Sequence, residues 1–174
     1  MNCSSSSAKN DEEEFESSSS NFFISTVLNA FPVSGLSRVL SADQLANYHG
    51  QTGQFFFVVN LSESSELGTH FVLIAKQGLK LFYLDPLKLG FVLNEHIPLF
   101  LASFPDCTVC QLKARIQPVD SWFCAFYCLN FVYMLNKKTS GLPYESLELV
   151  DLKKNDCRAI NNLMLVFQYF WEKE

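Results

Sequence analysis

Hydrophobic and polar positions divide the chain into a polar beginning and a longer part with regular apolar patterns. Residues 1–21 are rich in Ser and acidic side chains and contain few apolar ones. Such a segment buries too little apolar surface to offset the entropy that it would lose on ordering. We therefore predict a flexible tail over residues 1–21 and a single folded domain over residues 22–174.

The apolar patterns of the folded part predict both strands and helices. Segments rich in Phe, Val and Leu predict strands over residues 54–60, 70–76, 79–84 and 107–113. Longer apolar segments predict helices over residues 22–31, 42–48, 93–104 and 123–136, and two amphipathic segments follow at 144–152 and 157–171. This order predicts an α+β fold with a small mixed or antiparallel sheet packed with helices.

Two of the predicted strands form a hairpin. With Gln77-Gly78 as its two-residue turn, His70 lies directly opposite Asp85. Opposite side chains on one face of a sheet have Cβ atoms about 4.5–5.5 Å apart, so the imidazole and the carboxylate could hydrogen-bond. The carboxylate would then fix the tautomer of the ring and stabilise its charged form. A register shift of one residue would instead leave two unrelated polar residues on opposite faces.

Cys124 opens the apolar segment that is predicted as a central helix. The positive end of a helix dipole stabilises a thiolate, and a nearby histidine would favour the thiolate further. The usual role of a cysteine on an apolar helix is a buried structural thiol. We keep that role for Cys128, which lies one turn along the helix, and predict Cys124 as a nucleophile.

Gln117 precedes Cys124 by seven residues. A loop of that length could bring the side-chain amide back beside the start of the helix. The amide and the backbone N–H of Cys124 would then converge on a developing oxyanion. The alternative is an ordinary solvated loop residue.

Composition and charge narrow the classes of function. The chain has 174 residues, 48% of them hydrophobic, which suits one buried core and excludes wholesale disorder. Its net charge of −5 argues against a general polyanion-binding surface. No secretory signal is visible, and the most apolar segment, residues 122–135, is shorter than the roughly 18–20 residues that span a membrane. We expect a soluble, intracellular protein whose six cysteines are thiols rather than a disulfide framework.

Three sequence blocks carry the four candidate residues. They are Gly68-Thr69-His70-Phe71, Phe82-Tyr83-Leu84-Asp85-Pro86 and the segment from Gln117 to Cys128. In order and composition they resemble the adenain family, the maturation proteases of adenoviruses, and the related SUMO-specific Ulp cysteine proteases. The seven-residue step from Gln117 to Cys124 and the compact length are more similar to adenain. Two positions depart from the family, because Ala125 replaces a usual Gly and Phe71 replaces a Trp that many relatives carry.

The resemblance implies a cysteine protease domain over residues 22–174, with an adenain/Ulp-like fold whose central buried helix starts at the nucleophile. Cys124 would be that nucleophile, His70 the general base, Asp85 the residue that orients the base, and Gln117 the oxyanion donor. The implied reaction is endopeptidase cleavage after small residues, at Gly-Gly-like sites, in precursor proteins of a virus or mobile element. One alternative is a deconjugating protease for ubiquitin- or SUMO-like proteins, and another is an inactive, protease-derived binding module.

The resemblance also concerns partners. Protein substrates are implied, and adenain is assisted by a viral peptide, through a disulfide, and by DNA. Cys107 or Cys110 would link such a peptide here, whereas the nearly neutral folded part gives little support for activation by DNA. We expect no metal or other cofactor, because the Cys-x-x-Cys pair has no second Cys or His pair near it in the sequence. By the same resemblance the protein would act in a host nucleus or a virion, without a membrane.

Overall fold

The computed structural model describes residues 21, 23–29, 33–65, 70–90, 94–136 and 152–171. Residues 23–29 form a helix that precedes the other elements. In chain order, these are β1 (Leu36–Ser41), the 3-10 helix η1 (Ala42–Tyr48), β2 (Phe55–Asn60), β3 (Phe71–Gln77), β4 (Lys80–Leu84), α2 (His96–Ala102), β5 (Thr108–Gln111), α3 (Cys124–Leu135) and α4 (Leu152–Trp171). The predicted tail up to residue 20 and most of the predicted amphipathic segment 144–152 lie outside the described residues.

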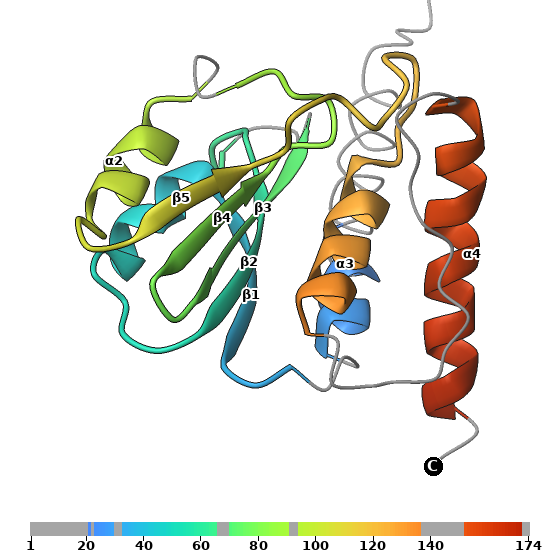
Figure 1. The fold of residues 1–174 in the computed structure, drawn as a ribbon, viewed down its shortest axis with the longest axis horizontal. Coiled ribbons are helices and arrows are strands. Elements are labelled where there is room, and N and C mark those ends of the chain that lie inside the picture. Colours follow the sequence, from blue (N-terminus) through green and yellow to red (C-terminus); the bar gives the residue numbers. More distant parts are fainter. Residues whose placement is uncertain are drawn as a thin grey trace, which may run out of the picture.

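The strands form one five-stranded sheet in the order β1-β2-β3-β4-β5. The two inner pairs, β2–β3 and β3–β4, are antiparallel, and the outer pairs, β1–β2 and β4–β5, are parallel. Helices cover both faces: η1 and α2 lie on one side, α3 lies on the other, and α4 packs outside α3 (Figure 1). The predicted α+β class, with a mixed sheet packed with helices, is therefore confirmed.

The hydrophobic core has one part on each face of the sheet. Along β2, Phe56 and Val58 pack toward α3, whereas Phe55, Phe57 and Val59 pack toward α2 and η1. Successive strand residues point to opposite faces, so a strand covered on both sides is apolar throughout. All six residues of β2 are buried, which explains its unbroken run of Phe and Val.

Helix α3 is the central buried helix that the apolar pattern predicts. It begins at Cys124 and ends at Leu135, within one residue of the predicted bounds at each end. Most of its residues are buried because it is enclosed by the sheet on one side and by α4 on the other (Figure 1). A helix enclosed in this way is apolar all round rather than amphipathic.

The sequence patterns do not predict β1. Its residues alternate irregularly between apolar and polar types, LSRVLS, and only Leu40 among them is buried. The strand lies at the edge of the sheet and pairs in parallel with β2 alone. An edge strand with one partner has little buried surface, and so its sequence carries a weak signal.

The hairpin of β3 and β4 exists, but the predicted turn is wrong. Gln77 pairs with Lys80, so the two turn residues are Gly78 and Leu79 rather than Gln77 and Gly78. Gly78 has φ +59°, the left-handed region that glycine adopts without strain. The register is therefore displaced by two residues from the predicted one. A displacement of two keeps every side chain on its predicted face.

Candidate active site

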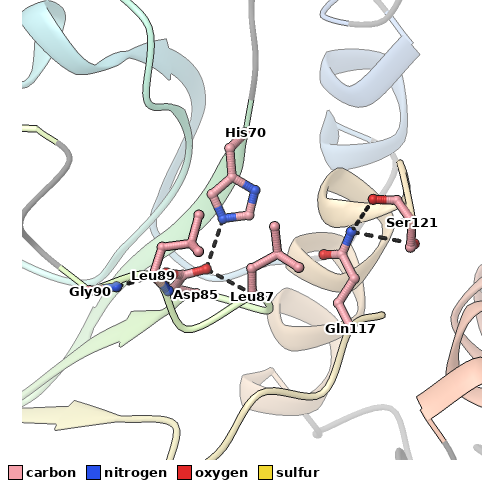
Figure 2. A network of polar contacts seen from close by, with 7 residues as sticks. All are labelled: His70, Asp85, Leu87, Leu89, Gly90, Gln117 and Ser121. Atoms are coloured by element: carbon pink, nitrogen blue, oxygen red, sulfur yellow. Dashed lines mark hydrogen bonds and ion pairs between the residues drawn. The ribbon is translucent and has the colours of Figure 1, made fainter. Parts of the chain in front are cut away.

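His70 and Asp85 meet at the end of the hairpin. His70 immediately precedes β3, and Asp85 immediately follows β4. The imidazole Nε2 lies 2.8 Å from Asp85 Oδ1, and both residues are buried, with 6% and 3% of their surface exposed (Figure 2). The predicted pairing of an imidazole with a carboxylate is thus present in the structure. It leaves Nδ1 as the ring nitrogen that is not bonded to the carboxylate.

The loop after β4 holds the Asp85 carboxylate with backbone N–H groups. Leu87 N–H donates to Oδ1 at 3.0 Å, and the N–H groups of Leu89 and Gly90 donate to Oδ2 at 2.7 and 3.3 Å (Figure 2). Two left-handed residues bend this loop around the carboxylate: Lys88 with φ +54° and Gly90 with φ +81°. Donors on both oxygens fix the orientation of the carboxylate and favour its ionised form.

The two groups stabilise each other's charged forms. Burial disfavours the charged imidazole, but hydrogen bonds to Asp85 and Cys124 outweigh this and raise the pKa of His70 to about 9. Burial also opposes ionisation of Asp85, yet the hydrogen bond and charge of His70 hold the pKa of that carboxyl below its usual value. At neutral pH the pair is therefore an imidazolium and a carboxylate.

Cys124 is the first residue of α3, and its side chain lies beside the imidazole of His70. Its interactions with His70 are among those that raise the pKa of the ring. Cys124 is 8% exposed, so little of its side chain is accessible to solvent. Cys128, one turn further along α3, is fully buried, and burial raises the pKa of its thiol well above the usual value. A thiol of that kind stays protonated, consistent with the structural role predicted for it.

Gln117 is buried in the loop that leads to α3. Its backbone N–H donates to the carbonyl of Pro86 at 3.1 Å, which ties this loop to the one around Asp85. Its side-chain NH₂ donates to the carbonyl of Ser121 at 2.9 Å and contacts Ser121 Oγ at 3.3 Å (Figure 2). The side-chain oxygen, Oε1, is buried and has no hydrogen-bond partner among the described residues. The structure thus brings Gln117 to the start of the helix, with its amide directed at Ser121.

Sequence patterns miss the contribution of α4 to this loop. Asp156 Oδ1 accepts hydrogen bonds from Ser121 Oγ at 2.8 Å and from the hydroxyl of Tyr127 at 2.9 Å. Next to it, Asn155 Nδ2 donates to the carbonyl of Ile116 at 2.8 Å. These partners are separated by 29 to 39 residues in the chain, so no local spacing connects them. Asp156 immediately precedes the predicted amphipathic segment 157–171, and nothing in the sequence pattern there indicates a contact with this loop.

A cavity of about 330 Å³ adjoins the same loop. Loop residues and one residue of α4 line it: Pro118, Asp120, Ser121, Trp122, Phe123 and Asp156. Trp122, two residues before Cys124, is 91% exposed, which is unusual for an indole. The cavity and the indole together offer a mixed apolar and acidic surface next to the start of α3.

The other residues named by the sequence analysis take no part in the hydrogen bonds described above. Cys110 belongs to β5, the edge strand beyond β4, and Cys107 precedes that strand. Both are free thiols of intermediate exposure. Ala125 and Phe71 are buried in the core between the sheet and α3. Among the described residues, no group of three or more His, Cys, Asp or Glu side chains is placed to hold a metal ion, and no helix is long and apolar enough to cross a membrane.

Comparison with known proteins adds only a likeness of fold. No protein-family model and no curated protein matches the chain. Among solved structures, the fold is similar to that of AvrA, determined as a deletion variant with IP6 and CoA. The sequences are 16% identical, the TM-score is 0.48, and the match covers 86% of this chain. The match spans 57% of the AvrA chain, and the likeness concerns the fold and not the activity.

Proposed function

We propose that the protein is a cysteine peptidase that uses Cys124, His70 and Asp85. The observation that carries this proposal is the geometry around one imidazole. The ring donates to a carboxylate held by three backbone N–H groups, and a cysteine at a helix start lies beside the same ring. A nucleophile, a base and a group that orients the base are the parts that thiol-dependent acyl transfer requires.

The charge state of the pair sets the order of the steps. With His70 protonated at neutral pH, Cys124 can act as a thiolate in an ion pair with the ring. The thiolate sulfur attacks the carbonyl carbon of the scissile amide and forms a C–S bond and an oxyanion. When the C–N bond breaks, the imidazolium gives its proton to the leaving amine, and a thioester remains on Cys124. The neutral ring then takes a proton from water as the water oxygen attacks the thioester carbonyl. The C–S bond breaks, the carboxylic acid leaves, and the Cys124 thiolate and the His70 imidazolium are restored.

The oxyanion would be bound by the backbone N–H of Cys124 and by the side-chain NH₂ of Gln117. A nitrogen with two hydrogens can serve two acceptors. The carbonyl of Ser121, at 2.9 Å, and its Oγ, at 3.3 Å, can share one of these hydrogens in a three-centre bond, and the other hydrogen would then serve an oxyanion. This assignment gives the buried amide a chemical role beyond its loop contacts.

The burial of the reacting groups supports a preference for small residues. His70 is 6% exposed and Cys124 is 8% exposed, so the carbonyl of a substrate reaches the sulfur only through a narrow approach. A glycine before the scissile bond passes such an approach with the least steric cost. Cleavage after Gly-Gly-like sequences, in precursor proteins, is therefore the specificity that we propose. Viral substrates, an activating peptide on Cys107 or Cys110, and action in a nucleus or virion stay predictions from the family resemblance.

The test is labelling and cleavage with matched cysteine variants. The probe is a peptide ending in Gly-Gly with a thiol-reactive vinyl sulfone in place of the scissile carbonyl. Parent protein and Cys157→Ser, which removes an exposed thiol, should both be labelled, whereas Cys124→Ala should not. The same proteins are then given a Gly-Gly peptide and a SUMO fusion. Labelling that persists at the parent level in Cys124→Ala, or a parent that cleaves neither substrate, would contradict the proposal.

A further inference from the structure

We infer that Asp156 on α4 is a positioning residue for oxyanion binding, acting through the hydroxyl of Ser121. The inference rests on the proposed function and deepens it. Asp156 touches neither Cys124 nor His70 in any described contact, so its effect would be transmitted by the loop between Gln117 and α3.

One hydroxyl group connects α4 to the two ends of this loop. Ser121 Oγ donates to Asp156 Oδ1 at 2.8 Å. The same oxygen accepts the backbone N–H of Phe123 at 3.3 Å and faces the amide nitrogen of Gln117 at 3.3 Å. Because its single hydrogen is committed to the carboxylate, the lone pairs of Oγ must face Phe123 and Gln117. Asp156 therefore determines which way the hydroxyl points, and through it the placement of the amide and of the chain entering Cys124.

A second hydroxyl holds the carboxylate in place. Tyr127 OH, from the first turn of α3, donates to the same Oδ1 at 2.9 Å. Burial and the hydrogen bond to Asp156 raise the pKa of Tyr127, so this group remains a donor across the working pH range. Hydrogen bonds to an ionised oxygen are stronger than those between neutral groups. The loop, α3 and α4 are thus joined at one atom, next to the two proposed oxyanion donors.

A positioning role differs measurably from a purely structural one. The chain offers a matched control in Asn162, which also lies on α4 and also bonds to α3, through Asn130 Oδ1 at 3.0 Å. That contact lies further along both helices and does not reach the loop. Loss of the Asn162 contact should weaken the packing of α4 without moving Gln117 or Phe123.

The experiment compares turnover with simple alkylation of Cys124. Iodoacetamide reacts with the thiolate by displacement and builds no oxyanion, so its rate reports the nucleophile alone. Asp156→Ala and Ser121→Ala should each lower kcat on a Gly-Gly peptide by roughly 10- to 100-fold, because small misplacements of catalytic donors are costly. KM and the alkylation rate should stay within about twofold of the parent. The double variant should be no slower than the slower single variant, since both act through one contact.

Controls keep the outcomes distinct. Asn162→Ala should keep kcat near the parent value, and Ser121→Ala, which removes the same contact, carries the test if Asp156→Ala does not fold. A kcat that falls no further in the Asp156 and Ser121 variants than in Asn162→Ala would overturn the inference, as would alkylation that falls in parallel with kcat. If the parent shows no turnover, the proposed function fails. Amide hydrogen exchange over residues 117–123 then tests the positioning alone. Exchange should be faster in Asp156→Ala than in the parent, but not in Asn162→Ala. Equal exchange rates in the two variants would refute the inference.

Discussion

His70 and Asp85 form a 2.8 Å hydrogen bond although they do not stand opposite each other in the β3–β4 ladder. The last pair of the ladder is Leu73 with Leu84, so its continuation would place Asp85 opposite Val72. The two side chains are therefore diagonal neighbours on one face, where Cβ atoms are about 7–8 Å apart and long side chains still meet. The loop that holds the Asp85 carboxylate completes the contact by fixing the direction in which the carboxylate points.

Replacing Asp85 by Asn should impair the orientation of the His70 ring without abolishing the reactivity of the Cys124 thiol. An amide can touch the ring but does not stabilise imidazolium, and the wrong tautomer of His70 becomes favourable. We expect turnover to fall by roughly 10²–10⁴-fold while Cys124 stays accessible to small alkylating agents. Steady-state kinetics on a Gly-Gly peptide and iodoacetamide labelling measure the two effects.

The matched control for this prediction is Asp43→Asn. That carboxylate is also hydrogen-bonded, to the backbone N–H and hydroxyl of Ser64, but it belongs to η1 and not to the site. The turnover of Asp43→Asn should equal that of the parent. Unchanged turnover in Asp85→Asn would show that the contact with His70 is structural only.

Much of the fold is readable from the sequence because its signals are local. The unbroken apolar run of β2 and the all-apolar helix α3 report elements that are buried on every side. The pairing of His70 with Asp85 is readable for a subtler reason. The turn is misplaced, but the resulting register error is two residues, and a period of two preserves the face on which each side chain lies.

Other features depend on contacts that no local pattern carries. The edge strand β1 buries little surface and so lacks a clear apolar alternation. The contact of Asp156 with Ser121 spans 35 residues and requires α4 to pack against α3. The direction of the Gln117 amide is likewise set by its hydrogen bond to Ser121, and nothing in the sequence distinguishes Ser121 from other loop serines. Sequence order predicts which side chains assemble, and tertiary packing decides how they are oriented.

The ionisation of His70 should make stability depend on pH. Its pKa of about 9 in the fold lies above the ordinary value of 6.5, so the protonated ring stabilises the protein fully below pH 6.5. This stabilisation is lost as the pH rises through 9. Relative to His70→Gln, the free energy of unfolding of the parent should fall between pH 6.5 and 9 by up to about 3 kcal/mol, from 1.36 kcal/mol per pKa unit.

Urea denaturation at steps across this range measures the difference between the two proteins. Titration of the ring by NMR gives an independent reading, and Cys124→Ala should lower the pKa of His70 because the thiol contributes to raising it. Parallel stability curves, together with a ring that titrates near 6.5, would contradict the charged pair.

Trp122 should affect substrate binding rather than chemistry. Its indole is 91% exposed beside the cavity of about 330 Å³, so it packs against little in the free protein. Trp122→Ala should therefore change the free energy of unfolding by no more than about 0.5 kcal/mol. A partly buried aromatic contact contributes about 1.4 kcal/mol to binding, which corresponds to a factor of 10. We therefore expect KM for a protein precursor to rise roughly 10-fold, with kcat unchanged. Val119→Ala, on the same loop and 71% exposed, is the control that should leave KM alone.

Gln117→Ala separates an oxyanion donor from a buried loop residue. Attack of a thiolate on an amide builds negative charge on the carbonyl oxygen, so donors must already be aimed at it. If the Gln117 NH₂ is one of them, turnover should fall roughly 10²–10³-fold, or about 2.7–4 kcal/mol. The bond to Ser121 is lost as well, which should lower the free energy of unfolding by about 0.5–1.5 kcal/mol.

These two effects are told apart by measuring kcat at a temperature where the variant is fully folded, with thermal unfolding as the check. A residue that only shapes the loop would reduce stability and leave kcat per folded molecule within a few-fold of the parent. An oxyanion donor would reduce kcat far more than the alkylation rate of Cys124, because alkylation builds no charge on oxygen. Binding of a peptide aldehyde adds a third reading, since its adduct with Cys124 carries the same oxyanion. Its affinity should fall with kcat in Gln117→Ala, and an unchanged affinity would remove Gln117 from the proposed site.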